Sequence, residues 1–163
     1  MRILKISKSY FDKFPYEKYE LLPNKDEAGR QRPYVLLLSL KYKGVNRPFA
    51  IPFRSNLSEK VPPNEYFSLP PRPTTRKFRK HALQFSKMFP VNKKYYEKYN
   101  PRDNDWWFDA IRNLIERKKH EIVDMAQAYL DKCENEGYSE LASKIDDIIE
   151  ILDKKDDIIC PTE

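Results

Sequence analysis

Residues 33–54 read PYVLLLSLKYKGVNRPFAIPFR, and this stretch decides what kind of fold the chain can adopt. Pro33 to Tyr42 is an apolar run of strand length. The turn-forming pair Lys43-Gly44 follows, and Asn46 to Arg54 forms a second apolar run. Two such runs around a short turn predict a β-hairpin at the centre of the fold.

The sequence on either side of this hairpin adds further short elements. Pro48 and Pro52 lack the amide hydrogen that a sheet ladder uses, so we expect the return strand at a sheet edge or interrupted by bulges. Residues 3–6 read as a strand and residues 9–13 as a short helix. Residues 83–91 alternate apolar and polar side chains, which predicts one further strand.

The pattern changes to helical spacing after residue 100. Asp103-Asn104-Asp105 offers a helix N-cap, apolar residues then recur at helical intervals, and Gly137 is a good stop. A second helix is predicted between Leu141 and Leu152. We therefore expect one α+β domain over residues 1–163, in which helices and a C-terminal helical pair pack on a compact, antiparallel, β-barrel-like sheet.

Charge divides the chain in the same place. Residues 1–100 hold 22 Lys and Arg against 8 Asp and Glu, a net charge of +14. Residues 101–163 hold 9 against 17, a net charge of −8. A basic, β-rich part interleaved with aromatic residues indicates a polyanionic partner, and an acidic helical part does not.

Several classes of function lack their motifs. The sequence has no phosphate-binding loop, no dinucleotide-binding turn and no zinc-protease helix. Residues 1–100 hold one histidine and no clustered pair of carboxylates on a predicted strand, so we expect no metal site and no cofactor. The N-terminus lacks the features of a signal peptide and no segment is long and apolar enough to span a bilayer, which favours the cytoplasm and no membrane association.

Basic and hydroxyl side chains beside predicted strands remain as chemical groups. RNA can be cleaved by its own 2′-hydroxyl, so an enzyme needs only to position the strand, move protons and stabilise charge on phosphorus. Arginine suits that last task because its planar fork grips two phosphate oxygens. A histidine could shuttle a proton near neutral pH. The candidate catalytic residues are Arg54, Ser55, His81 and Lys87.

Three segments carry a resemblance to a known family. Gln31-Arg32-Pro33-Tyr34 is similar to the family's loop into the long strand, where a basic side chain helps bind RNA. Pro52-Phe53-Arg54-Ser55, at the end of the hairpin, resembles the element that places a serine at the RNA-cleaving site of the type III toxins ToxN, AbiQ, CptN and TenpN. Residues 81–90 resemble a further strand of the same family. A lysine that some members carry just after the serine is absent, since Asn56 and Leu57 stand there. Arg54 or Lys87 would have to fill its role.

The resemblance implies a compact barrel similar to the MazF and Kid toxins. It also implies a metal-independent endoribonuclease that leaves a 2′,3′-cyclic phosphate and acts on cellular or phage RNA. A repeated RNA pseudoknot would inhibit the toxin in a closed assembly, with phage defence as the usual role. The RNA-binding residues expected are Arg32, Tyr34, Arg72, Arg76, Lys77, Arg79, Lys80, Lys93 and Lys94.

Two other interpretations stay open from the sequence alone. The first is an RNA-binding module without catalysis, in which Tyr95, Tyr96 and Tyr99 stack on bases beside neighbouring lysines. The second is a DNA-binding regulator that uses the C-terminal helices. Their net charge of −8 counts against it, because a recognition helix needs positive flanks.

Overall fold

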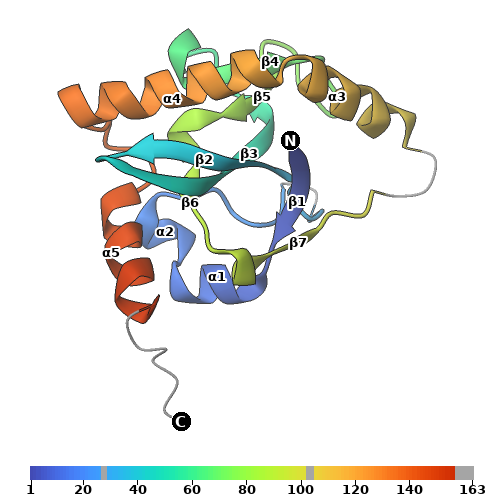
Figure 1. Cartoon of the computed structure of the whole chain (residues 1–163). Helices are drawn as coiled ribbons and strands as arrows, with labels where there is room; N and C mark the ends of the chain where they lie inside the picture. The colour runs from blue at the N-terminus through green and yellow to red at the C-terminus, as the bar shows by residue number, and fades with distance from the viewer. Residues whose placement is uncertain (27–28, 102–104, 157–163) are drawn as a thin grey trace.

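The computed structural model describes residues 1–26, 29–101 and 105–156. Seven strands form one antiparallel sheet in the order β4-β5-β3-β2-β1-β7, and the short β6 pairs with β3 (Figure 1). The strands are β1 (Arg2–Ile6), β2 (Tyr34–Tyr42), β3 (Val45–Leu57), β4 (Tyr66–Leu69), β5 (Lys80–Gln84), β6 (Phe89–Pro90) and β7 (Tyr96–Lys98). The helices are α1 (Lys8–Lys13), α2 (Tyr16–Tyr19), α3 (Trp106–Arg117), α4 (Lys119–Glu136), α5 (Ile145–Asp156) and the 3₁₀ turns η1 (Pro63–Glu65), η2 (Phe85–Lys87) and η3 (Lys93–Tyr95).

The predicted hairpin β2–β3 lies at the centre of the sheet because both of its faces are covered. In Figure 1, α3 and α4 lie on one side of the hairpin and α1, α2 and α5 on the other. Val35 and Leu37 belong to the core cluster that includes residues of α3 and α4, whereas Tyr34 and Leu36 belong to the cluster that includes residues of α1, α2 and α5. Side chains alternate between the two faces of a strand, so a strand buried on both sides is apolar at nearly every position. This explains the continuous apolar run that made the hairpin recognisable in the sequence.

The prolines of β3 are accommodated by bulges and by a change of partner, and not by an edge position. β3 lies between β2 and β5, so the predicted edge position is wrong. The register shifts between Leu37 and Leu40, opposite Pro48, which confirms the alternative of a bulge. Pro52 lies between the part of β3 that pairs with β6 and the part that pairs with β5.

The expected barrel is corrected to an open sheet. β4 and β7 end the strand order, and no pairing joins them in the described part of the chain. Each outer strand is short, so neither is positioned to close the sheet on itself. The α+β class and the packing of helices on the sheet are confirmed.

Two predicted elements are divided in the structure. The single strand expected over 83–91 is wrong, because the turn η2 separates β5 from β6. The apolar spacing from residue 107 to Gly137 belongs to α3 and α4, which meet at Lys118, and not to one helix. Asp105 caps α3 by accepting a hydrogen bond from the Phe108 amide at 2.9 Å, whereas Asp103 and Asn104 lie outside the described residues. The predicted stop at Gly137 is confirmed, with φ of 85°.

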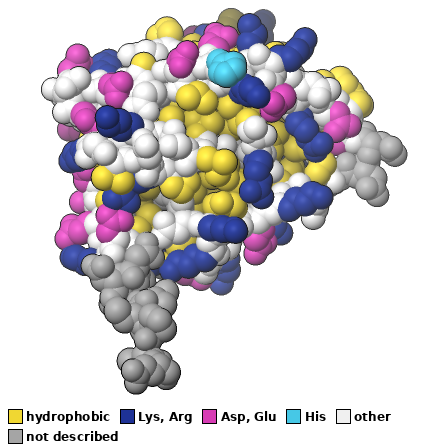
Figure 2. Space-filling view, in the orientation of Figure 1, with side chains coloured by type: hydrophobic (Ala, Val, Ile, Leu, Met, Phe, Trp, Pro, Cys, Tyr) yellow, Lys and Arg dark blue, Asp and Glu magenta, His cyan; other side chains and the backbone are white. Residues whose placement is uncertain are grey.

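One face of the molecule exposes an apolar area beside basic side chains. Figure 2 shows hydrophobic side chains in the middle of this face, with Lys and Arg at its right and lower margins. Leu38, in the β2 bulge, is 65 % exposed and lines a shallow pocket with Met1 and Val123. None of the described helices is long and apolar enough to cross a membrane.

Candidate functional site

Two adjoining pockets form a groove around the end of β3, which we call the Arg54 groove. One pocket, of about 370 Å³, is lined by Arg32, Arg54 and Ser55 among others. The other, of about 600 Å³, is lined by Arg54 and Lys87 among others. Leu22 and Arg54 line both pockets, so the two spaces adjoin at these side chains. The structure thus brings three of the four candidate catalytic residues together from β3 and η2.

The position of Arg54 follows from the register of β3 against β5. Arg54 lies opposite Ala82, so its side chain shares a sheet face with Gln84, two residues farther along β5. Its Nη1 donates a hydrogen bond to Gln84 Oε1 at 3.0 Å, and Gln84 Nε2 donates to Ser86 Oγ at 3.0 Å. Gln84 is only 4 % exposed, so these hydrogen bonds attach the Arg54 guanidinium to a buried side chain.

Ser55 reaches the groove because β3 bulges where it leaves β5. The register shifts between Arg54 and Leu57, and Arg54, Ser55 and Asn56 all line the same pocket. Regular alternation along a strand would turn Ser55 to the other face, and a bulge can re-aim a side chain in this way. Asn56 Oδ1 accepts a hydrogen bond from the Arg76 amide at 2.8 Å, which connects the groove to the basic loop between β4 and β5.

Lys87 enters the groove from the end of η2. Its Nζ donates to the carbonyl oxygen of Glu20 at 2.9 Å and lies 3.8 Å from the Glu20 carboxylate. Burial lowers the pKa of Lys87, the Glu20 carboxylate opposes this shift, and the positive charges of Arg54 and Lys144 lower the pKa further. This ammonium group therefore releases a proton more readily than a lysine in solvent.

His81 lies apart from this groove, which corrects the expected placement. It neighbours Ala82 on β5, so its side chain points to the face opposite Arg54, where its ring packs against Phe53 and Trp107 with centroids 6.0 and 5.0 Å apart. His81 is 2 % exposed, and burial lowers its pKa from 6.5 to about 4. A neutral imidazole on that face is not placed to shuttle protons at the groove, and we leave His81 out of the proposed catalytic set.

Arg32 and Tyr34 hold the loop before β2 in place. Arg32 is 9 % exposed, and its guanidinium donates to the carbonyls of Pro23 at 2.9 Å and Phe53 at 2.7 Å, although it also lines the groove. Tyr34 is fully buried, with its hydroxyl 3.3 Å from Asn24 Oδ1. In this conformation Tyr34 presents no surface on which RNA could stack.

Of the remaining predicted RNA-binding residues, Arg72 is half-buried in the loop after β4 and lines a separate pocket, and the others divide between two places. Arg76, Lys77, Arg79 and Lys80 are exposed on the loop and strand start between β4 and β5, which we call the basic loop. Lys93 and Lys94 are exposed on η3, whose Tyr95 packs against Tyr10 of α1, and neither lysine lines the groove. The basic loop is therefore joined to the candidate site through Asn56, whereas Lys93 and Lys94 are not part of the groove.

Sequence reasoning missed three residues here. Gln84 and Glu20 hold Arg54 and Lys87, and only the strand register and the position of α2 reveal them. Phe78 lies in the basic loop, is 73 % exposed and has φ of 64°, a left-handed conformation that is rare for an aromatic residue. The sequence signal for Phe78, an aromatic residue flanked by Lys77 and Arg79, was visible.

A metal site is a separate question. In the part of the chain that the structure describes, no three His, Cys, Asp or Glu side chains lie close enough together to hold a metal ion. The Arg54 groove presents the cations of Arg54 and Lys87, the Ser55 hydroxyl and the Gln84 amide.

Comparison with known proteins places this fold. No family profile matches the sequence, and no curated protein matches it. A solved structure from work on selective toxin inhibition by a non-coding RNA pseudoknot, in bacterial type III toxin–antitoxin systems, has a TM-score of 0.69 over 95 % of this chain and 97 % of that chain, at 16 % identity. Another, from a bacterial antiviral system that a processed non-coding RNA regulates, has a TM-score of 0.65 over 92 % and 96 %, at 13 % identity. The predicted resemblance is confirmed at the level of the fold.

Proposed function

We propose that this chain is an RNA-cleaving enzyme whose active site is the Arg54 groove. The observation that carries this proposal is the convergence of Arg54, Ser55 and Lys87 on one groove, beside a basic loop. More particularly, we propose the toxin of a type III toxin–antitoxin system, located in the cytoplasm and acting in phage defence. The shared fold with the two solved structures supports this role.

The proposed reaction is internal transfer at phosphorus. The 2′-oxygen of one nucleotide forms a bond to the adjacent phosphorus as the P–O5′ bond breaks, which leaves a 2′,3′-cyclic phosphate and a 5′-hydroxyl. Water takes the 2′-hydroxyl proton, and Lys87 donates a proton to the leaving O5′. Arg54 stabilises the additional negative charge on the phosphoryl oxygens, and the Ser55 hydroxyl donates a hydrogen bond to one of them. The lowered pKa of Lys87 fits its task as an acid.

The proposed partner is an RNA antitoxin that covers the groove. A net charge of +14 on residues 1–100, with four exposed cations on the basic loop, supports the binding of a polyanion. We propose that a repeated pseudoknot RNA binds this surface in a closed assembly with several toxin chains. Cellular or phage RNA then takes the same groove when the antitoxin is lost.

The test is cleavage of RNA by the purified chain in excess EDTA. We expect cleavage with products that end in a cyclic phosphate, and a loss of about a hundredfold or more in rate for Arg54→Ala, Ser55→Ala and Lys87→Met. Lys132→Met, which removes an exposed cation on α4, is the matched control and should cleave normally. Cleavage that needs added magnesium would contradict the metal-independent mechanism, and full activity in a groove variant would remove that residue from the site.

One observation favours the alternative, RNA binding without cleavage. Phe78 is an exposed aromatic ring in the basic loop, with Lys77 Nζ 5.2 Å from its ring centroid, and such pairs suit base stacking beside phosphate contacts. Tight RNA binding without any cleavage, under all metal conditions, would favour this alternative.

A further inference from the structure

A second cavity, which we call the Arg72 pocket, lies beside the Arg54 groove. It has a volume of about 550 Å³, within the range of about 300–1,000 Å³ that is common for small-ligand sites. Asp26 lines both the Arg72 pocket and the Arg54 groove, so the two spaces adjoin at this residue. The lining comes from β1, the loop before β2, the loop after β4, the segment after β7 and the start of α3; these residues are Lys5, Asp26, Gly29, Arg30, Gln31, Arg72, Tyr99, Asn100 and Asp105.

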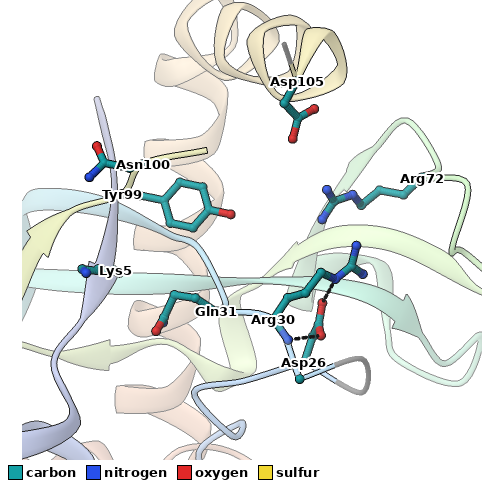
Figure 3. A pocket seen from close by; sticks show the side chains of 9 residues that line it. Lys5, Asp26, Arg30, Gln31, Arg72, Tyr99, Asn100 and Asp105 are labelled. Carbon is teal, nitrogen blue, oxygen red and sulfur yellow. Dashed lines mark hydrogen bonds and ion pairs between the residues drawn. The ribbon is translucent and has the colours of Figure 1, made fainter. Parts of the chain in front are cut away.

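Two guanidinium groups face the same space in this pocket. Figure 3 shows the Arg30 and Arg72 side chains pointing toward one another. Asp26 accepts hydrogen bonds from Arg30 Nε at 3.0 Å and from the Arg30 amide at 2.9 Å, which leaves the terminal nitrogens of Arg30 turned toward the pocket. Among the described residues, neither these nitrogens nor the Arg72 guanidinium has a hydrogen-bond acceptor. Two like charges held this way form a receptor for an anion.

The Arg72 guanidinium is held in place from behind. It lies 4.2 Å from the Trp107 ring centroid, within the range of a cation–π interaction. Trp107 in turn packs against His81, whose Nδ1 lies 3.0 Å from the Pro70 carbonyl oxygen. The half-buried Trp107 ring, packed on the buried His81 ring, therefore supports the Arg72 guanidinium from one side.

The other side chains of the pocket could contact the sugar or the base of a nucleotide as well as its phosphate. Tyr99 packs one face of its ring against Phe108, with centroids 5.2 Å apart, and its hydroxyl points into the pocket (Figure 3). The Asp105 carboxylate also faces the pocket and could accept a hydrogen bond from a sugar hydroxyl or a base N–H (Figure 3). Cations, an aromatic ring and a carboxylate together match a nucleotide, which has acceptors, a ring and donors.

We propose that the Arg72 pocket binds one nucleotide of the RNA strand that passes through the Arg54 groove, with its phosphate between Arg30 and Arg72. This proposal rests on the proposed function, because it assumes that RNA occupies the groove. It makes Arg72 a residue that selects and aligns a nucleotide at a distance from the bond that is cut.

The test measures binding of single-stranded RNA that carries a 2′-deoxy sugar at the mapped cleavage position, so that the strand stays intact. The strand is lengthened one nucleotide at a time, on the 5′ side in one series and on the 3′ side in another. For the wild-type chain we expect affinity to rise about tenfold at one length in one series, when a nucleotide reaches the pocket. The rise should be absent in Arg72→Met and Arg30→Met and present in Arg117→Met, an exposed control on α3.

Two further arms separate the possible outcomes. Antitoxin RNA and the substrate strand are each titrated against the wild-type chain and Arg72→Met. If Arg72→Met weakens the binding of only one of the two, that RNA is the one that uses the pocket. An equal rise with length in Arg72→Met, in a variant with unchanged near-UV circular dichroism, would overturn the proposal. If the wild-type chain cleaves no RNA, the same two length series are titrated as unmodified strands. An Arg72-dependent rise in affinity there would overturn the proposed catalysis and leave the proposed pocket standing.

Discussion

Acidification should destabilise this chain through His81, by an amount that follows from its burial. Burial lowers the pKa of His81 to about 4, against 6.5 in an unfolded chain. Between these two values the unfolded chain binds a proton that the folded chain does not, so the free energy of unfolding falls as the pH falls. The stabilisation is present above about pH 6.5 and is lost progressively toward pH 4. Between pH 7 and pH 5 the loss amounts to about 2 kcal/mol.

The tautomer of His81 supports this reasoning. The Pro70 carbonyl can only accept a hydrogen bond, so the Nδ1 atom 3.0 Å away carries the proton of the neutral ring. A second proton would charge a ring enclosed by Phe53 and Trp107, close to the positive charge of Arg72. Protonation of His81 therefore lowers the free energy of unfolding, because the folded state would have to bury the charge.

The assay is urea unfolding followed by tryptophan fluorescence at pH 7 and pH 5. The wild-type chain should lose about 2 kcal/mol more than His81→Gln over this interval, because the glutamine does not titrate. His120→Gln, at an exposed position on α4, is the matched control and should behave as the wild type. Equal losses in the wild type and His81→Gln would refute the argument and would place an ordinary, solvated histidine at position 81.

Three other predictions concern a buried hydroxyl, a buried hydrogen bond and the basic loop. Ser143→Ala should leave the free energy of unfolding unchanged or raise it by up to about 1 kcal/mol, because the buried Ser143 Oγ has no partner in the described structure; a loss of more than 1 kcal/mol in urea unfolding would contradict this. Tyr10→Phe should lower it by about 1–2 kcal/mol, since the Tyr10 hydroxyl donates to the buried Pro90 carbonyl at 2.8 Å, whereas Tyr16→Phe, on an exposed side chain, should change nothing. Replacing the four basic-loop cations with alanine should weaken RNA binding and reduce the slope of log K against log salt by about 0.7 for each lost phosphate contact. An equal effect from a control set of four cations on and between α3 and α4 would instead place the RNA-binding surface on the helices. The loop set is Arg76, Lys77, Arg79 and Lys80, and the control set is Arg117, Lys118, Lys119 and Lys132.

The fold was predictable wherever one local pattern decided the structure. The run around Tyr34 to Tyr42 is apolar at almost every position because β2 is covered on both faces, and Gly137 ends a helix because it adopts a positive φ. The open sheet was not predictable, because closure depends on how far the outer strands extend. The break at Lys118 left the helical spacing of apolar residues unchanged, so the sequence carried no sign of it.

The candidate site was predictable in part for a related reason. The sequence selected Arg54, Ser55 and Lys87 because their residue types suit the chemistry and they adjoin strands, and the structure places them in adjoining pockets. The sequence could not tell which sheet face each side chain takes, and a single bulge after Arg54 decides that for Ser55. For the same reason His81 was expected at the site: the sequence does not say which face of β5 its side chain takes, and in the structure it lies on the face opposite Arg54.

The segment between α4 and α5 joins the acidic part of the chain to the Arg54 groove. The Ser143 amide donates to the Ser86 carbonyl at 2.9 Å, and the Lys144 amide donates to the Tyr19 carbonyl at 3.0 Å. Ser139 and Leu141 line this groove together with Lys87 and Arg54. The basic part carries the catalytic candidates, but part of the groove lining comes from the acidic part. We therefore expect a chain truncated before Ser139 to keep most of its basic surface and to lack a complete groove.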